Sequence, residues 1–385
     1  MSDNKLKASL LWASVATAAA GFIFYNVMPL YLGQLQESTG LTTSQIGLIA
    51  SAFFFGFNIA SFSSYFWVRK LPPFQMATAG TLTLLVFLML ANYSNSFLFQ
   101  MIVTAAIGGI SGAVGSIGVT IAGDADNNTR WYGIQVAAEA AAGVVLLFVL
   151  PVTLIPSYGF AGVIYGMIIM IVILLPAYLF LTRVPLPVGG ADQAQPGAAV
   201  VNTQQAKFPV WVALVAMTLL FVSSAAVWAF VERIAAINAF DPEAVGRLLG
   251  ISLFFAVVGS LAAGAAGDRF GNVWPYIANC LLLLVGVMTI ALTDDLLVYA
   301  VGACIFMFGW AAAFAFLFAI IADLDPDGKH IALSVPALGV GSMIGPGMAG
   351  FLLSEGSTAS LQLMCVVTMV ASVVLAWISS RETVS

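Results

Sequence analysis

The sequence is divided into twelve apolar stretches, each long enough to cross a lipid bilayer as a helix. Such a helix needs about 20 apolar residues, because each residue adds about 1.5 Å along the axis. The runs cover residues 8–32, 44–68, 73–92, 97–122, 131–154, 159–182, 208–232, 243–266, 273–293, 296–322, 331–353 and 359–379. None shows the two-residue alternation of a membrane β-barrel. The pattern therefore predicts an all-α membrane protein with twelve transmembrane helices.

The composition supports a chain surrounded by lipid. Of the 385 residues, 61% are hydrophobic and only 8% are charged. A soluble domain has about 45–50% apolar and roughly 25% charged residues. This excludes a soluble enzyme, a nucleic-acid binder and a disordered scaffold. The first apolar run is too long for the core of a cleaved signal peptide, so we interpret it as the first span.

The basic residues predict the orientation of the chain. If both termini are cytoplasmic, only Arg233 and Arg247 face the opposite side. The other ten basic residues then lie inside: Lys5, Lys7, Arg69, Lys70, Arg130, Arg183, Lys207, Arg269, Lys329 and Arg381. Cytoplasmic loops are enriched in Lys and Arg, so this count favours cytoplasmic N- and C-termini. Because the loops are short, we expect a multi-pass protein of the bacterial inner (plasma) membrane.

The chain also contains an internal duplication. A Pro-, Gly- and Gln-rich stretch, 183–207, has the composition of a flexible linker. It separates a predicted N-terminal six-helix bundle, 1–182, from a C-terminal one, 208–385. At an offset of 199 residues, Trp12, Gly47, Asp124, Asp126 and Arg130 fall on Trp211, Gly246, Asp323, Asp325 and Lys329. Two pseudo-symmetric bundles are the architecture of transporters that work by alternating access.

A loop motif follows the eighth span. The segment Gly264-Ala265-Ala266-Gly267-Asp268-Arg269-Phe270-Gly271 resembles the Gly-x-x-x-Asp-Arg-x-Gly motif of the major facilitator superfamily. The copy after the second span keeps Arg69 and Lys70 but has Val68 in place of the aspartate. The resemblance extends over essentially the whole chain and implies a secondary transporter.

Two further segments bear on the subfamily. Leu41-Thr42-Thr43-Ser44-Gln45-Ile46-Gly47 is similar to the start of helix 2 in drug:proton antiporter-type members. The Gly/Pro-rich motif that those antiporters carry in helix 5 is missing from the fifth span here. A similar segment, 341–350, lies in the eleventh span instead. The subfamily therefore stays open.

Glu139 is the main candidate for proton coupling. It lies nine residues into the fifth span, near the middle of the membrane, among small residues. An ionisable side chain inside a bilayer is costly and usually functional. A carboxylate in this position can bind and release a proton. The alternative is a structural hydrogen bond to a neighbouring helix.

Other residues are candidates for the substrate cavity. The family resemblance implies that helices 1, 4, 7 and 10 line a central cavity, with helices 2, 5, 8 and 11 beside them. The candidates are Tyr25, Asn26, Asn58, Trp228, Glu232, Arg233 and Trp310. The aromatic and amide residues can instead be packing residues. Glu232 and Arg233, at the predicted end of the seventh span, can instead form a local ion pair or extend to the headgroups.

A cytoplasmic gate is predicted from charged residues at the inner ends of the helices. Its candidates are Asp124, Arg130, Asp268, Arg269, Asp323 and Lys329. In similar transporters the aspartate of the loop motif docks near the inner end of helix 5, which predicts that Asp268 meets Arg130 or that helix end. The alternative is ordinary capping, because carboxylates before a helix start suit its dipole.

Several other motifs do not indicate chemistry. Gly109, Gly112, Gly115 and Gly118 recur at a three-residue spacing, which is typical of close helix packing rather than of nucleotide binding. There is no Gly-Lys-Ser/Thr phosphate loop. The one histidine, His330, cannot form a metal site alone. We expect no cofactor, no metal and no enzymatic activity, and the three cysteines to be packing residues.

The sequence favours a proton-coupled secondary transporter of a small organic solute. Few basic residues lie deep in the predicted spans, and the lining candidates are aromatic and acidic. Export of a weakly polar or cationic compound is therefore the first hypothesis, with uptake of a small metabolite by symport as the alternative. A passive facilitator and a membrane sensor or assembly factor remain open. The expected partners are the substrate, protons and the bilayer, and the expected state is a monomer without nucleic acid.

Overall fold

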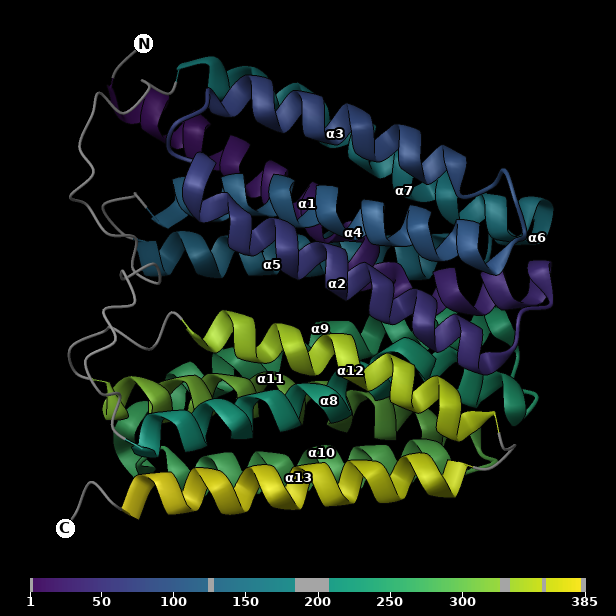
Figure 1. The fold of residues 1–385 in the computed structure, drawn as a ribbon, viewed down its shortest axis with the longest axis vertical. Coiled ribbons are helices and arrows are strands. Elements are labelled where there is room, and N and C mark those ends of the chain that lie inside the picture. Colours follow the sequence, from purple (N-terminus) through teal and green to yellow (C-terminus); the bar gives the residue numbers. More distant parts are fainter. Residues whose placement is uncertain (1–2, 124–127, 184–207, 326–332, 355–357, 382–385) are drawn as a thin grey trace. The chain divides into compact units, whose positions relative to one another are not determined.

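The computed structural model describes residues 3–123, 128–183, 208–325, 333–354 and 358–381 (Figure 1). Within these residues the first half contains eight helical elements, and no strand is present in either half. They are α1 (Asp3–Thr39), α2 (Thr43–Trp67), α3 (Pro73–Leu90), α4 (Phe97–Gly123), α5 (Asn128–Val149), α6 (Ile155–Tyr158), α7 (Phe160–Leu174) and the 3₁₀ helix η1 (Leu175–Arg183).

The second half contains seven helical elements within the described residues. They are α8 (Phe208–Ile237), α9 (Pro242–Ala266), the 3₁₀ helix η2 (Gly267–Phe270), α10 (Val273–Leu292), α11 (Leu296–Leu324), α12 (Ser334–Leu353) and α13 (Thr358–Arg381). Within the described part of the chain, eleven helices are long and apolar enough to cross a membrane, counting α7 with η1 as one. A twelfth apolar helix, Ile134–Val149, is shorter. The predicted all-α membrane fold is confirmed.

The structure corrects three of the predicted span ends, two of them at prolines. The fifth span was predicted over 131–154, but α5 ends at Val149, because Pro151 disfavours a helical conformation at Leu150. The end of the sixth span is the 3₁₀ helix η1 rather than α-helix, since Pro176 has no amide hydrogen to donate. The seventh span was predicted to end at residue 232, but α8 continues to Ile237.

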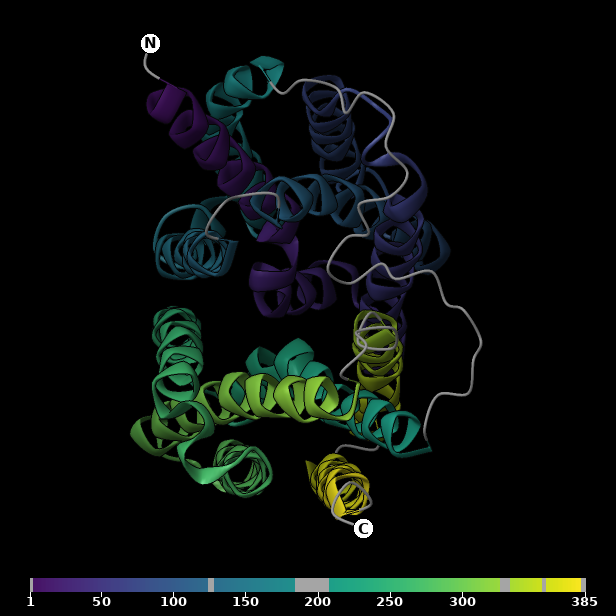
Figure 2. The same ribbon diagram turned by 90° about the vertical axis from the view of Figure 1, so that its left-hand side faces the viewer.

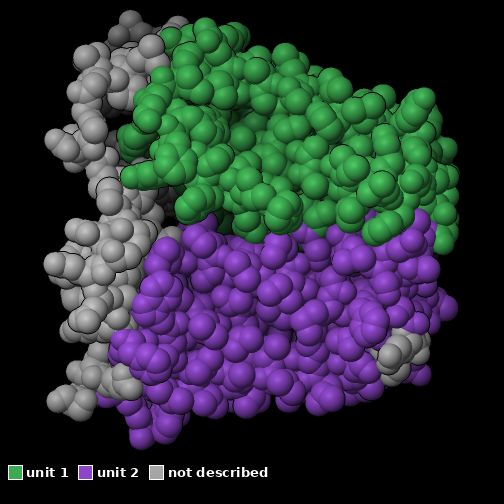
Figure 3. Space-filling view, viewed as in Figure 1, with its two compact units in different colours: residues 1–40, 52–195 green, residues 41–51, 196–385 purple. Residues whose placement is uncertain are grey.

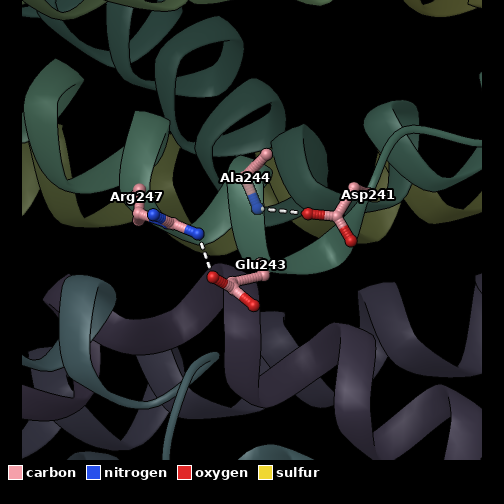
Figure 4. Close-up of polar contacts among 4 residues, drawn as sticks. All are labelled: Asp241, Glu243, Ala244 and Arg247. Atoms are coloured by element: carbon pink, nitrogen blue, oxygen red, sulfur yellow. Dashed lines mark hydrogen bonds and ion pairs between the residues drawn. The ribbon is translucent and has the colours of Figure 1, made fainter.

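The start of α9 is set by a local cap. The Oδ2 atom of Asp241 accepts a hydrogen bond of 2.9 Å from the backbone amide of Ala244, and Pro242 occupies the first helical position (Figure 4). Glu243 forms an ion pair with Arg247 one turn later. Capping satisfies an amide that the helix itself leaves without an acceptor. This is the behaviour expected of an Asp-Pro-Glu sequence.

The two halves pack their helices by the same scheme. In the first half, α1 packs against α4, α5 and α7, and α3 packs against α4. In the second half, α8 packs in the same way against α11, α12 and α13, and α10 packs against α11. The first helix of each half is also the most enclosed, since 72% of an 18-residue apolar stretch is buried in α1 and in α8, against 22% in α3. The duplication seen in the sequence is therefore a duplication of packing.

The helices of each half run side by side in both ribbon views (Figure 1, Figure 2). The chain divides into two compact units, coloured in Figure 3. Unit 1 comprises residues 1–40 and 52–195, and unit 2 comprises residues 41–51 and 196–385. Helix α2 is thus shared, because its first turns group with unit 2. Apart from Arg183, the predicted linker 183–207 lies outside the described residues, so the predicted domain boundaries stay a prediction.

Candidate functional site

The structure brings Asn26 and Glu139 together in unit 1. Asn26 lies on α1 and is buried, and its Nδ2 atom donates a hydrogen bond of 2.9 Å to the backbone carbonyl oxygen of Glu139 on α5. The Nε2 atom of Gln135, one turn earlier on α5, donates a hydrogen bond of 3.0 Å to Oε1 of Glu139. A carboxylate and two amides therefore form one polar cluster. The sequence analysis singled out Asn26 and Glu139 separately and missed Gln135.

The backbone geometry of α5 explains how Asn26 reaches its acceptor. A carbonyl oxygen has two lone pairs, and the helical hydrogen bond uses only one of them. A buried amide on a neighbouring helix can therefore donate to the second lone pair without breaking the helix. The contact fixes the turn of α5 that carries Glu139 against α1. The position of the carboxylate is thus set from two helices.

Aromatic side chains occupy the same region of α1. The rings of Phe24 and Phe53 stack with centroids 4.6 Å apart, and Phe24 lies 4.5 Å from the ring of Tyr31. Tyr25 is half-buried, and its ring makes an edge contact with Phe54 at 5.9 Å. Asn26 therefore lies between aromatic residues along α1.

Asn58 is a half-buried residue on α2, the helix that also carries Phe53 and Phe54. Helix α2 lies directly against α4, since a Cβ atom added to Gly56 would lie 1.9 Å from the backbone oxygen of Ala105. Whether Asn58 faces substrate stays a prediction.

In unit 2, Trp310 of α11 lies beside aromatic residues. Its ring makes an edge contact with Phe221 of α8 at 6.2 Å, and Phe314 contacts the same phenylalanine at 5.5 Å. The Nε1 atom of Trp310 is buried and has no hydrogen-bond partner among the described residues. A buried indole N–H usually has an acceptor. The atom is therefore a candidate donor to a bound molecule.

Trp228, Glu232 and Arg233 lie on α8. Trp228 is 4% exposed and Glu232 is 7% exposed, whereas Arg233 is half-buried. Tyr299 of α11 donates a hydrogen bond of 2.8 Å to the backbone oxygen of Val231 and lies close enough to interact electrostatically with Glu232. Because α8 continues to Ile237, Glu232 is a buried residue within the helix rather than at its end. It is thus a second candidate for proton binding.

The predicted cytoplasmic gate lies largely outside the described part of the chain. Asp124 and Lys329 lie outside the described residues, as do the side chains of Arg130 and Asp268. Arg269 is exposed. Oδ2 of Asp323 accepts a hydrogen bond of 2.7 Å from Nδ2 of Asn272, a residue that the sequence analysis missed. This bond joins the end of α11 to the start of α10.

The described residues contain no group of three or more His, Cys, Asp or Glu side chains that could hold a metal ion. His330 lies outside the described residues. In unit 1 the side chains of two amides, Asn26 and Gln135, lie at Glu139, and in unit 2 aromatic rings lie at Trp310. Such groups bind protons or small organic molecules rather than a structural metal.

Comparison with known proteins agrees with this arrangement. Residues 13–236 and 213–385 match the family model of the Major Facilitator Superfamily. The crystal structure of the nucleoside transporter NupG is similar with a TM-score of 0.75 and 13% identity, covering 98% of this chain and 99% of the other. A bacterial homologue of the human lysosomal transporter Spinster, inward-facing and occupied, is similar with a TM-score of 0.68 and 13% identity, covering 97% of each chain. Comparison with curated protein sequences finds no significant match.

The fold and the match together define a multi-pass membrane transporter that takes small-molecule substrates, and not an enzyme. The chain belongs to the Major Facilitator Superfamily. The resemblance noted in its loop motif is therefore confirmed, and the subfamily stays open. Both solved structures are 13% identical to this chain, so they support the fold and not a substrate.

Proposed function

We propose that the chain is a proton-coupled secondary transporter that moves a small organic solute by alternating access. Glu139 is its proton-coupling residue. The observation that carries the proposal is the cluster of Asn26, Gln135 and Glu139. A carboxylate within a transmembrane helix is costly in energy and is retained where it does work on ions or substrates. Here two hydrogen bonds position the carboxylate and its backbone.

The substrate proposed first is a weakly polar or cationic compound, and the direction proposed first is export. The candidate lining residues Tyr25, Trp228 and Trp310 are aromatic, and Glu139 and Glu232 are acidic. Aromatic faces and carboxylates attract cations. A polyanionic substrate would instead need basic residues at this depth.

Uptake of a small metabolite by proton symport is the alternative. A passive facilitator is distinguished from both because its transport never exceeds equilibration under an imposed proton gradient. A membrane sensor or assembly factor is the remaining alternative and is disfavoured by the family match. This alternative, a protein without transport, predicts no substrate-dependent change in conformation or thermal stability.

The proposed topology has cytoplasmic N- and C-termini in the bacterial inner membrane, and the proposed state is a monomer. The topology is supported by the basic residues, because the twelve-span arrangement places ten of them on one side and two on the other. In this topology Asp268, Arg269, Arg130, Asp124, Asp323 and Lys329 lie at the cytoplasmic ends of the helices. We propose that Asp268 closes this side against the start of α5. An unchanged inward/outward distribution of spin-label distances in Asp268→Asn would remove this gate.

The test of the proposed function begins with a substrate. Thermal-shift screening of the purified protein against metabolites and drugs identifies compounds that bind the folded state, because such ligands raise its stability. A compound found in this way is then measured in proteoliposomes under an imposed pH gradient. Each pH unit is worth about 1.4 kcal/mol per proton, so one coupled proton gives roughly tenfold accumulation or depletion per unit.

Glu139→Gln is expected to abolish this concentrative transport while exchange of the compound at equal pH continues. The reason is that glutamine keeps the shape and polarity of the side chain but cannot bind a proton. Glu37→Gln is the matched control, because Glu37 is an exposed carboxylate at the end of α1. Glu232→Gln tests the second candidate. Concentrative transport that survives in Glu139→Gln but is lost in Glu232→Gln would assign proton coupling to α8.

A further inference from the structure

The side-chain amide of Gln135 makes a hydrogen bond through its nitrogen but not, among the described residues, through its oxygen. The residue is 3% exposed, and its Nε2 atom donates to Oε1 of Glu139 at 3.0 Å. Its carbonyl oxygen, Oε1, is buried and has no hydrogen-bond partner among the described residues. A buried acceptor without a donor costs free energy, so such groups are rare in native proteins and call for an explanation.

The chemistry of the two groups supplies the missing donor. A primary amide and a protonated carboxyl group form a ring with two hydrogen bonds: the amide N–H donates to one carboxyl oxygen, and the carboxyl O–H donates to the amide oxygen. Gln135 and Glu139 are four residues apart on α5, which puts their side chains on the same face of the helix. The observed bond from Nε2 to Oε1 is one half of this ring. The other half needs one proton on the second carboxyl oxygen.

We infer that the proton-binding unit of this transporter is the pair formed by Glu139 and Gln135, in which the bound proton lies between Oε2 of Glu139 and the amide oxygen of Gln135. This inference rests on the proposed role of Glu139. In the protonation step one O–H bond of hydronium breaks and one O–H bond forms on the carboxyl group, which removes its negative charge and leaves a water molecule. Gln135 is then a positioning residue. Its amide oxygen accepts a hydrogen bond from the carboxyl O–H of Glu139 and so holds the carboxyl group in one orientation.

The surroundings leave Glu139 as the acid with which the amide can pair. The helices that pack against α5 are α1, α4 and α7. Between residues 9 and 36 of α1, the titratable groups are Tyr25 and Tyr31; α4 has none, and α7 has only Tyr165. On α5 itself, the other ionisable groups are Arg130 and Tyr132, near the start of the helix. No second carboxyl group of these segments competes for the proton.

The test is infrared difference spectroscopy of the purified, lipid-reconstituted protein, with pH as the only variable. The carboxyl C=O band that appears on acidification is assigned to Glu139 by its loss in Glu139→Gln. Hydrogen bonding lowers the frequency of this band. Gln135→Met keeps the length of the side chain and removes the amide, so the band is expected to shift to higher frequency. Gln135→Asn, whose shorter side chain cannot close the ring, is expected to shift it in the same direction.

Gln362→Met is the matched control. Gln362 lies on α13 in unit 2 and also has a buried amide atom, Nε2, without a hydrogen-bond partner among the described residues. Its replacement is expected to leave the Glu139 band in place. A Glu139 band that keeps its frequency in folded Gln135→Met or Gln135→Asn would overturn the pair while leaving Glu139 as the proton-binding group. If instead no carboxyl band disappears in Glu139→Gln, the proposed function is overturned, and the pair with it.

Discussion

At the scale of single residues, the indole of Trp310 carries a prediction about substrate binding. Its buried Nε1 atom has no acceptor among the described residues, and a buried donor left without a bond costs about 1–3 kcal/mol. Trp310→Phe keeps an aromatic ring beside Phe221 and removes the N–H. A typical hydrogen bond contributes about 0.5–1.5 kcal/mol, so the KM of transport is expected to rise roughly twofold to tenfold.

The thermal midpoint of Trp310→Phe is expected to change little, because removal of an unpaired donor offsets the packing lost with the smaller ring. Trp274→Phe on α10 is the control, since Trp274 is 71% exposed. Its KM is expected to match that of the wild type. A wild-type KM in Trp310→Phe would show that the indole N–H does not contact substrate.

Part of the candidate site could be predicted from the cost of placing polar side chains in a membrane. Glu139 and Asn26 were identified because polar groups are rare within apolar spans. Their contact, from α1 to α5, joins residues far apart in the sequence, so no local pattern predicts it. Gln135 was missed although its signal was present, namely a glutamine four residues before a membrane carboxylate. The bond from Asn272 to Asp323 was missed because it depends on how α10 packs against α11.

At the scale of helices, the glycines of α4 predict where packing is tightest. A Cβ atom added to Gly108 would lie 2.0 Å from the backbone oxygen of Phe53 on α2. Real Cβ contacts are never that short, so α2 and α4 must separate to admit a methyl group. Overpacking of this kind costs typically 1–3 kcal/mol. Gly108→Ala is expected to lower the stability of the protein by about this amount, measured as unfolding in denaturing detergent.

The next residue on the same helix is the control. A Cβ atom at Gly109 would lie 3.6 Å from the backbone oxygen of Gly56, which is an ordinary contact distance. Gly109→Ala is expected to leave stability unchanged or to raise it by up to about 1 kcal/mol, because alanine favours a helix more than glycine does. Equal losses in both variants would argue against a close contact between α2 and α4 at Gly108.

The existence and approximate positions of the apolar helices could be predicted from the sequence, whereas the residues at which they end were harder to predict. Hydrophobic length alone identified the spans, because a bilayer imposes a minimum of about 20 residues. The ends at Val149 and Leu174 depend on Pro151 and Pro176, which apolar length does not register. Conversely, the start of α9 is set by a local interaction, the hydrogen bond from the amide of Ala244 to Asp241. Local chemistry thus predicts helix ends where polar residues set them.

At the scale of the whole molecule, helix α2 is the element that the two units share. Residues 41–51, which include its first turns, group with unit 2, whereas the rest of the helix packs in unit 1. The contact with α12 is close, since a Cβ atom added to Gly47 would lie 2.4 Å from the backbone oxygen of Pro346. Ser44 also donates a hydrogen bond of 3.3 Å to the backbone oxygen of Gly350. A continuous helix cannot stay rigidly packed in two units that move relative to each other.

Alternating access therefore predicts that the start of α2 separates from α12 during transport. Ser51 and Gly347 allow a direct test. A Cβ atom on Gly347 would lie 3.9 Å from Cβ of Ser51, close to the value of about 3.8 Å that is typical of disulfides. The one closer atom is the Ser51 hydroxyl, which the substitution replaces. The pair Ser51→Cys and Gly347→Cys, with Cys280, Cys304 and Cys365 changed to alanine, is expected to form a disulfide under mild oxidation.

The oxidised double variant is expected to bind the transported compound but not to carry it across the membrane, and a reductant is expected to restore transport. The reason is that the disulfide holds the start of α2 on α12, so one of the two access states cannot form. Each single-cysteine variant is the control and is expected to transport equally with oxidant and with reductant. Full transport through the oxidised double variant would show that the start of α2 moves together with α12, and that α2 must then bend near Ser51 as the two units move.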